Sequence, residues 1–261
     1  MTTLEPKSAS PGAGMTTTDS SAPQPKYKRI LLKLSGEAFC RPGGFGIDPV
    51  ELDLIAREIV EATGAGTQIS IVVGGGNIIR GAELAAQGHL HQATADQMGM
   101  LGTVINALAL KEKLVSIGVP CRVMSAIEIR AVAENFIRGR AIRHMEKGRV
   151  VILAAGTGNP FFTTDTCAAL RATELDCDIL LKATKVDGVY TADPKKDPSA
   201  KKFDTLTFAD AMTKKLRVMD MTALAMCSEH RLPVMVFDFH RTGNIARVVR
   251  GERIGTLLHT G

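Results

Sequence analysis

Short apolar segments alternate with longer amphipathic segments along most of this chain. The short segments have the length of buried strands and predict strands over residues 30–34, 68–73, 119–124, 150–155, 179–183, 233–239 and 256–258. Apolar positions at helical spacing predict helices over residues 50–62, 94–117, 138–147, 208–214, 222–230 and 245–249. Strands separated by helices are typical of βαβ units. We therefore expect an α/β fold with three layers, in which helices cover both faces of a central, mainly parallel sheet.

The first part of the chain has a different composition. Residues 1–26 are rich in Thr, Ser, Pro, Ala and Gly and hold few large apolar side chains. Such a segment buries too little surface to offset the entropy lost on ordering. We expect residues 1–26 to form a disordered tail and residues 27–261 to form a single domain.

Composition narrows the class of protein. The 261 residues are 45% hydrophobic, which is sufficient for one large α/β core. The five cysteines form no Cys-x-x-Cys pair, which favours reduced thiols and a cytoplasmic location over a disulfide framework or a zinc site. No apolar run approaches the roughly 18 residues of a membrane span, so we expect no membrane association.

The net charge of +5 has two possible meanings. A mild positive balance suits phosphorylated ligands, which it attracts over a distance. It is also compatible with a regulatory protein that binds nucleic acid. The arginine-rich clusters at residues 138–149 and 241–253 have no stacking aromatic side chains interleaved with them, which argues against single-strand binding. We expect no nucleic-acid partner.

Two glycine loops follow predicted strands and are candidates for phosphate binding. Ser35-Gly36 follows the first strand, and Gly74-Gly75-Gly76 follows the second. Glycines let the backbone approach phosphate oxygens closely. Lys33 precedes the first of these loops, and Arg80, expected on the first helical turn after the glycines, can make a bidentate contact to a phosphate. Neither a P-loop motif nor a Gly-x-Gly-x-x-Gly motif is present, so the sequence favours neither a P-loop kinase nor a nicotinamide dehydrogenase.

A polar loop over residues 155–165 follows a third predicted strand. Two glycines, three threonines and an asparagine surround Phe161 and Phe162, and Asp165 closes the loop. This mixture suits a ligand with a flat ring and a charged phosphate. Asp165 also stands where a carboxylate can cap a following helix.

These loops, together with residues 182–194, resemble the amino-acid kinase superfamily. The loop at 157–164 and the segment Asp96–Leu101 are similar to its bacterial uridylate (UMP) kinase branch, and the resemblance spans about residues 27–258. It implies an amino-acid kinase-like fold and transfer of the γ-phosphoryl group of ATP to UMP, giving UDP and ADP, in pyrimidine nucleotide biosynthesis. It also implies Mg²⁺ bound with ATP, for which we assign no protein ligand.

The resemblance implies a role for each matching residue. Lys33, Arg80 and Asp165 are the implied catalytic residues, with Asp165 holding Lys33 in position. The implied ATP-binding residues are Lys33, Leu34, Ser35, Gly36, Gly76, Arg80, Thr184, Tyr190 and Asp193. The implied UMP-binding residues are Gly75, Asp96, Thr157, Gly158, Asn159, Pro160, Phe161, Phe162, Thr163 and Thr164, with Asp96 on the ribose hydroxyls.

Regulation and assembly are implied in the same way. The segment Arg41, Pro42, Gly43, Gly44, Phe45 and Gly46 resembles one involved in activation by GTP. The resemblance further implies inhibition by UTP and a homohexamer. Two alternatives remain open: a superfamily member that phosphorylates a carboxylate or carbamate, and the basic nucleic-acid-binding regulator. The Phe161-Phe162 loop and Asp96 favour the nucleotide acceptor over the first alternative.

Overall fold

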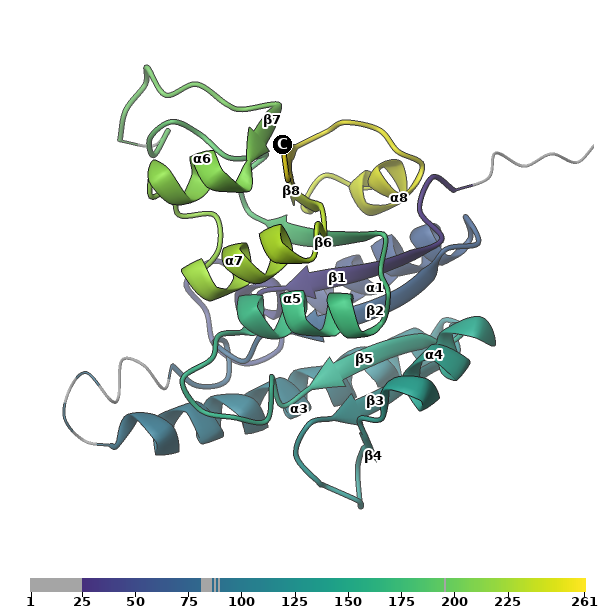
Figure 1. Cartoon of the computed structure of the whole chain (residues 1–261). Coiled ribbons are helices and arrows are strands. Elements are labelled where there is room, and N and C mark those ends of the chain that lie inside the picture. The colour runs from purple at the N-terminus through teal and green to yellow at the C-terminus, as the bar shows by residue number, and fades with distance from the viewer. Residues whose placement is uncertain (1–24, 81–85, 87, 89, 195) are drawn as a thin grey trace, which may run out of the picture.

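The computed structural model describes residues 25–80, 86, 88, 90–194 and 196–261, and Figure 1 draws their arrangement. Their strands form one nine-stranded sheet in the order β4-β3-β5-β2-β1-β6-β8-β9-β7. Every neighbouring pair is parallel except β8 and β9. The strands are β1 Arg29–Leu34, β2 Gln68–Val73, β3 Cys121–Ser125, β4 Glu134–Asn135, β5 Val150–Ala154, β6 Ile179–Thr184, β7 Thr205–Thr207, β8 Val234–Asp238 and β9 Thr256–His259.

Helices cover both faces of this sheet, as the sequence predicts (Figure 1). The helices are α1 Pro49–Thr63, α3 Gln92–Ser116, α4 Arg138–Glu146, α5 Thr164–Glu174, α6 Phe208–Thr213, α7 Met221–Glu229 and α8 Asn244–Val249, and a short 3₁₀ helix, η1, spans Gly36–Phe39. One buried cluster joins α1, α3 and α8 to the sheet. A second joins α4, α5, α6 and α7 to the opposite face. The predicted three-layer α/β fold is confirmed.

The alternation of side chains along β1 shows how the two cores form. Ile30, Leu32 and Leu34 point into the cluster with α1 and α3, and Leu31 points into the cluster with α5 and α7. Because both faces are covered, the strand is a nearly continuous apolar run. Lys33 has the same parity as Leu31 and therefore faces α5.

Four of the described elements are absent from the predicted strands and helices: η1, α5, β4 and β7. Helix α5 buries mainly Cys167 and small alanines, so its sequence has no stripe of large apolar side chains to reveal it. Strands β4 and β7 have two and three residues, which is too short for a periodic pattern.

The helix ends follow the expected chemistry: Asp48 accepts a hydrogen bond from the Val50 amide (2.8 Å) at the start of α1, and Gly118 adopts φ +86° after α3.

The expectations of a disordered tail and of no membrane association remain predictions. Most of the expected tail, residues 1–24, lies outside the described residues. None of the helices that the structure describes is long and apolar enough to cross a membrane.

Candidate active site

The loops that follow four parallel strands meet at one edge of the sheet. Strands β5, β2, β1 and β6 are neighbours and run in the same direction, so their carboxyl ends lie together. A hollow of about 480 Å³ opens there, which we call the first hollow. Among the predicted site residues, those that line it are Ser35, Gly36, Gly75, Gly76, Arg80, Asp96, Thr157, Asn159, Phe162 and Thr164. Predicted ATP-side and UMP-side residues therefore share one cavity.

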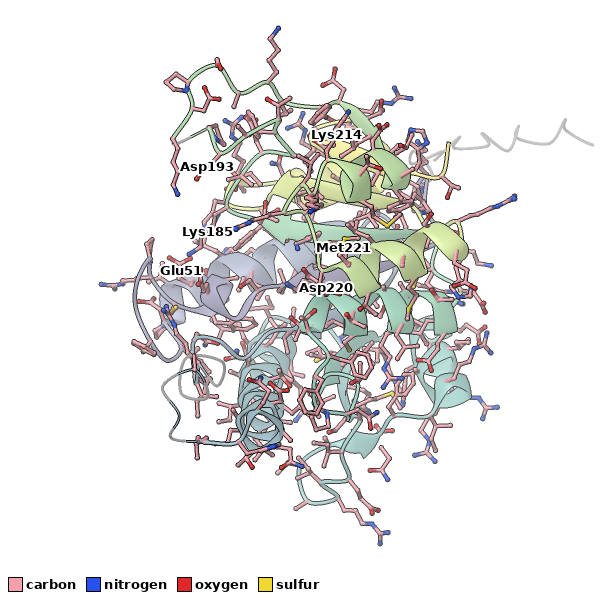
Figure 2. The ribbon with its side chains drawn as sticks, turned by 60° about the vertical axis from the view of Figure 1, so that its left-hand side comes forward. Glu51, Lys185, Asp193, Lys214, Asp220 and Met221 are labelled. Carbon is pink, nitrogen blue, oxygen red and sulfur yellow. The ribbon has the colours of Figure 1, made fainter. Side chains whose placement is uncertain are left out.

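A second hollow, of about 660 Å³, lies beside the end of β6. It is lined by Thr184, Tyr190 and Asp193, the residues predicted for the adenosine, and by Lys182 and Lys214. Asp193 and Lys214 are both labelled in the upper half of Figure 2. The Tyr190 hydroxyl donates a hydrogen bond to Asp187 Oδ1 (2.7 Å), which fixes the ring at the hollow's wall.

A buried cluster of three charged side chains stands between these hollows. Asp165 Oδ1 lies 2.7 Å from Lys33 Nζ, and Asp165 Oδ2 lies 2.5 Å from Lys182 Nζ. All three side chains are mostly buried, with exposed fractions of 11% for Lys33, 14% for Asp165 and 13% for Lys182. Lys182 also donates to the Val218 carbonyl oxygen. The predicted contact between Asp165 and Lys33 is present. The cluster adjoins both hollows, because Asp165 follows Thr164, which lines the first, and Lys182 lines the second.

Lys182 is a site residue that the sequence interpretation missed. It begins a segment that carries the family resemblance, but no role was assigned to it. The available signal was a lysine inside the otherwise apolar run Ile179–Ala183. A charged side chain in a buried strand requires a partner, and here the partner is Asp165.

The electrostatics of the cluster favour the ionised carboxylate. Burial acts to raise the pKa of Asp165, but the attraction of Lys33 and Lys182 outweighs it and holds that pKa below its ordinary value. Burial lowers the pKa of Lys182, the nearby Lys33 lowers it further, and Asp165 only partly offsets both. The cluster therefore holds one carboxylate between two ammonium groups.

Helix α5 begins at a different residue from the one considered in the sequence interpretation. Thr163, not Asp165, is the N-cap: its hydroxyl accepts hydrogen bonds from the Asp165 and Thr166 amides. Asp220, labelled in Figure 2 where α7 begins, accepts from the hydroxyls of both Thr163 and Thr166. Because Thr163 caps the helix, the Asp165 side chain is available for the two lysines.

The loop at 155–163 is held against α3 at both ends. The Ala155 amide donates to Thr103 Oγ1 (2.7 Å), and the Phe161 amide donates to Asp96 Oδ2 (2.7 Å). Both Ala155 and Phe161 adopt positive φ, 62° and 68°, which non-glycine residues adopt only under constraint. Asp96 thus positions the loop as well as facing the first hollow.

Not every predicted residue reaches a hollow. Leu34, Gly158, Pro160, Phe161 and Thr163, like Lys33 and Asp165 of the buried cluster, line neither hollow within the part of the chain that the structure describes. Leu34 belongs to the hydrophobic core, and Thr163 caps α5. Phe161 instead projects outward and is 69% exposed.

Arg80 lines the first hollow but is not on a helical turn, so that expectation is wrong. It follows the turn at residues 76–78 in an irregular segment. Its guanidinium carbon lies 5.4 Å from the centre of the Phe45 ring, close enough for a cation–π contact.

The two glycine loops are in direct backbone contact. A Cβ atom on Gly36 would stand 2.5 Å from the Gly76 nitrogen, and one on Gly74 would stand 2.5 Å from the Gly36 nitrogen. Side chains are excluded at both positions, which leaves backbone N–H groups accessible to a phosphate.

The segment predicted to respond to GTP lies beside these glycines. Arg41 pairs with Asp48 (2.6 Å), and the Gly46 amide donates to the Asn77 carbonyl oxygen (2.7 Å). Among the described residues, no group of three or more His, Cys, Asp or Glu side chains is arranged to hold a metal ion.

Comparisons with known proteins show the family to which this chain belongs. The chain belongs to the Amino acid kinase family, whose pattern it matches over residues 28–238. The uridylate kinase of Methylococcus capsulatus is 56% identical over 238 residues, which cover 91% of this chain and 99% of the relative.

Two solved structures share the fold. The UMP kinase of Bacillus anthracis superimposes with a TM-score of 0.87 at 42% identity, covering 89% of this chain and 96% of its own. The UMP kinase of Ureaplasma parvum gives a TM-score of 0.84 at 37% identity, covering 89% and 99%.

Proposed function

We propose that this chain is a UMP kinase, which transfers the γ-phosphoryl group of ATP to UMP and forms ADP and UDP. The observation that carries the proposal is the Lys33–Asp165–Lys182 cluster, which stands between two hollows suited to two nucleotides. The 56% identity to a uridylate kinase over nearly the whole chain supports the choice of acceptor.

In this proposal the two hollows divide the substrates. The second hollow takes the adenosine, with the Tyr190 ring for stacking and the Asp193 carboxylate for the ribose or amino group. The first hollow takes UMP, with Asp96 on the ribose and the loop at 157–164 around the uracil and phosphate. The reacting phosphates then meet between them, near Lys33 and the glycine loops.

The chemistry requires positioning and positive charge more than proton transfer. An oxygen of the UMP phosphate attacks the γ-phosphorus of ATP, and the bond from that phosphorus to the β–γ bridging oxygen breaks, so ADP leaves. The UMP phosphate is already anionic, and no general base is needed. Lys33, Lys182 and Arg80 offset the repulsion between the two nucleotides and stabilise charge on the moving phosphoryl group.

Asp165 acts in this scheme by holding both lysines. Its carboxylate lies within ion-pair distance of two ammonium groups, which already balance its charge. We therefore infer that Mg²⁺ enters with ATP and is held mainly by the phosphate oxygens, as is common for this ion. When bound, it supplies further positive charge to the transferred group.

The regulatory and assembly proposals rest on the family resemblance. We infer a cytoplasmic homohexamer that is activated by GTP, is inhibited by UTP and acts in pyrimidine nucleotide biosynthesis. The hydrogen bond from Gly46 to Asn77, which follows the glycine loop, offers a physical route from residues 41–46 to the phosphates. Light scattering tests the assembly, since a mass of 27.8 kDa in solution contradicts the hexamer. A flat rate during GTP titration contradicts only the activation.

The proposed reaction is tested by incubating the purified chain with ATP, Mg²⁺ and UMP and resolving the nucleotides. Formation of UDP and ADP in equal amounts is the expected result. Absence of UDP under conditions where the chain is folded contradicts the proposal.

A further inference from the structure

Two asparagine side chains form a buried amide pair beside the first hollow. Asn77 follows the glycine loop, Asn106 lies on α3, and they are 1% and 0% exposed. Asn77 Nδ2 donates to Asn106 Oδ1 (3.0 Å), and Asn106 Nδ2 donates to Asn77 Oδ1 (2.6 Å). Neither residue belongs to the cluster or to the predicted site residues.

Each amide in the pair also holds one backbone carbonyl oxygen. Asn106 Nδ2 donates to the Gly74 oxygen (2.8 Å), and Asn77 Nδ2 donates to the Gly46 oxygen (2.7 Å). Both hydrogens and the oxygen of each amide are therefore used. Flipping either amide would set its oxygen against a carbonyl oxygen, so the contacts also define the orientation of the amides.

Helix α3 thereby holds both sides of the first hollow. Asn106 fixes the glycine loop through Gly74, and Thr103, one turn earlier, fixes the loop at 155–163 through the Ala155 amide. Buried polar groups are costly unless every bond is made, and here they are made to the two loops that the reaction would use.

The pair also acts on the position of Arg80, through Gly46 and Phe45. Gly46 is clamped to Asn77 by two hydrogen bonds, one in each direction. Its neighbour Phe45 is 69% exposed, and the guanidinium group of Arg80 lies over its ring. Because Gly46 is fixed, the preceding residue, Phe45, is held with its exposed ring against Arg80.

We propose that Asn77 and Asn106 are positioning residues for phosphoryl transfer. They set the glycine loop, and through Gly46 the Phe45–Arg80 contact, at the spacing from the acceptor loop that the reaction needs. This inference rests on the proposed function. Neither side chain touches the reacting atoms, so the expected effect is on kcat more than on KM.

The test compares Asn106→Leu with Ser70→Ala. Ser70 is equally buried in β2, and its hydroxyl donates to the Ile30 oxygen (3.1 Å), but it holds no loop of the site. In Asn106→Leu we expect kcat for UDP formation to fall about 10- to 100-fold, because small misplacements of reacting groups have effects of that size. KM for UMP should change less than about threefold. Ser70→Ala should keep the wild-type kcat.

A second readout does not depend on activity. The Gly46 N–H donates to the Asn77 carbonyl oxygen, and in Asn106→Leu the Asn77 side chain loses its Asn106 partner. Hydrogen exchange of the Gly46 amide should therefore be faster in Asn106→Leu than in the wild type or Ser70→Ala. Asn106→Asp, which keeps the shape but presents oxygen to the Gly74 and Asn77 oxygens, repeats both measurements if the leucine variant does not fold. The double variant with Asn77→Leu should be no slower than the slower single variant, because the two amides act as a unit.

The outcomes separate the two proposals. A wild-type kcat in Asn106→Leu, or losses that multiply in the double variant, overturns the positioning role. So does a fall in kcat that Ser70→Ala shares. If the wild type itself forms no UDP, the proposed function fails first, and unchanged Gly46 exchange would overturn the role of the pair independently.

Discussion

Lys33 and Lys182 are register partners on the neighbouring parallel strands β1 and β6. Both face α5, whose first turn carries the carboxylate that they share, Asp165. Two ammonium groups and one carboxylate leave one positive charge in a buried position between two hollows. Since strand pairing fixes the spacing of the lysines, this charge is preorganised for an anionic group.

Lys33→Met is predicted to lower kcat for UMP phosphorylation about 10²–10³-fold while leaving the fold intact, since one preorganised charge has effects of that size. Arg80→Met is the companion variant, and it should raise KM at least as much as it lowers kcat. Steady-state kinetics with circular dichroism measure both. Identical behaviour of the two variants contradicts the proposed separation of roles, and a near-normal kcat/KM removes Lys33 from the catalytic residues.

Lys182 should give the pH profile an alkaline limb. Its pKa is lowered by burial, so the ammonium group loses its proton below the ordinary lysine value of 10.5. If its charge supports the reaction, kcat falls as pH rises through this lowered pKa. Lys182→Arg, whose side chain stays charged, should move the limb to higher pH. An unchanged limb in a folded, active Lys182→Arg variant assigns the titration to another group.

Asp165→Asn is predicted to destabilise the fold by about 3 kcal/mol at neutral pH, because it leaves two buried ammonium groups without a carboxylate. The pKa of Asp165 is lowered in the folded state, so its stabilisation is complete above 3.8 and is lost as pH falls through the lowered pKa. The gap in unfolding free energy between wild type and variant should therefore narrow below pH 3.8. Denaturant unfolding over a pH series measures it, and a gap that widens on acidification contradicts the assignment.

Asp96→Asn is predicted to raise KM for UMP. In the wild type, one carboxylate oxygen accepts from Gln92 and the other from the Phe161 amide. The amide of the variant keeps the size of the carboxylate but loses its charge and one of these two acceptor oxygens. The loop at 155–163 should also be cut faster by proteases, because one of its two ties to α3 is weakened. An unchanged KM with a protected loop would remove Asp96 from the acceptor side.

The fold was largely predictable because buried strands and amphipathic helices carry strong periodic signals. The helix α5 escaped because Cys167 and its alanines pack closely without a large apolar stripe. The capping role considered for Asp165 belongs to Thr163; both residue types are good caps, and only the structure shows which side chain accepts from the amides.

The candidate site was predictable only in part. Lys33, Asp165 and the glycine loops lie in recognisable local motifs. The role of Lys182 depends on the register of β1 against β6, and that of Asn106 on contacts between segments 29 residues apart or more. Local sequence patterns contain neither the strand pairing nor the packing of α3 against the loops.

The central claim is tested most directly by letting phosphoryl acceptors compete for labelled ATP. UMP, CMP, dUMP, aspartate and carbamate are present at equal concentrations with Mg²⁺, and the labelled products are resolved early in the reaction. Sites that hydrogen-bond their substrate reject analogues lacking the right group strongly, so UDP should dominate. Labelled aspartyl phosphate or carbamoyl phosphate at a level comparable to UDP would contradict the account.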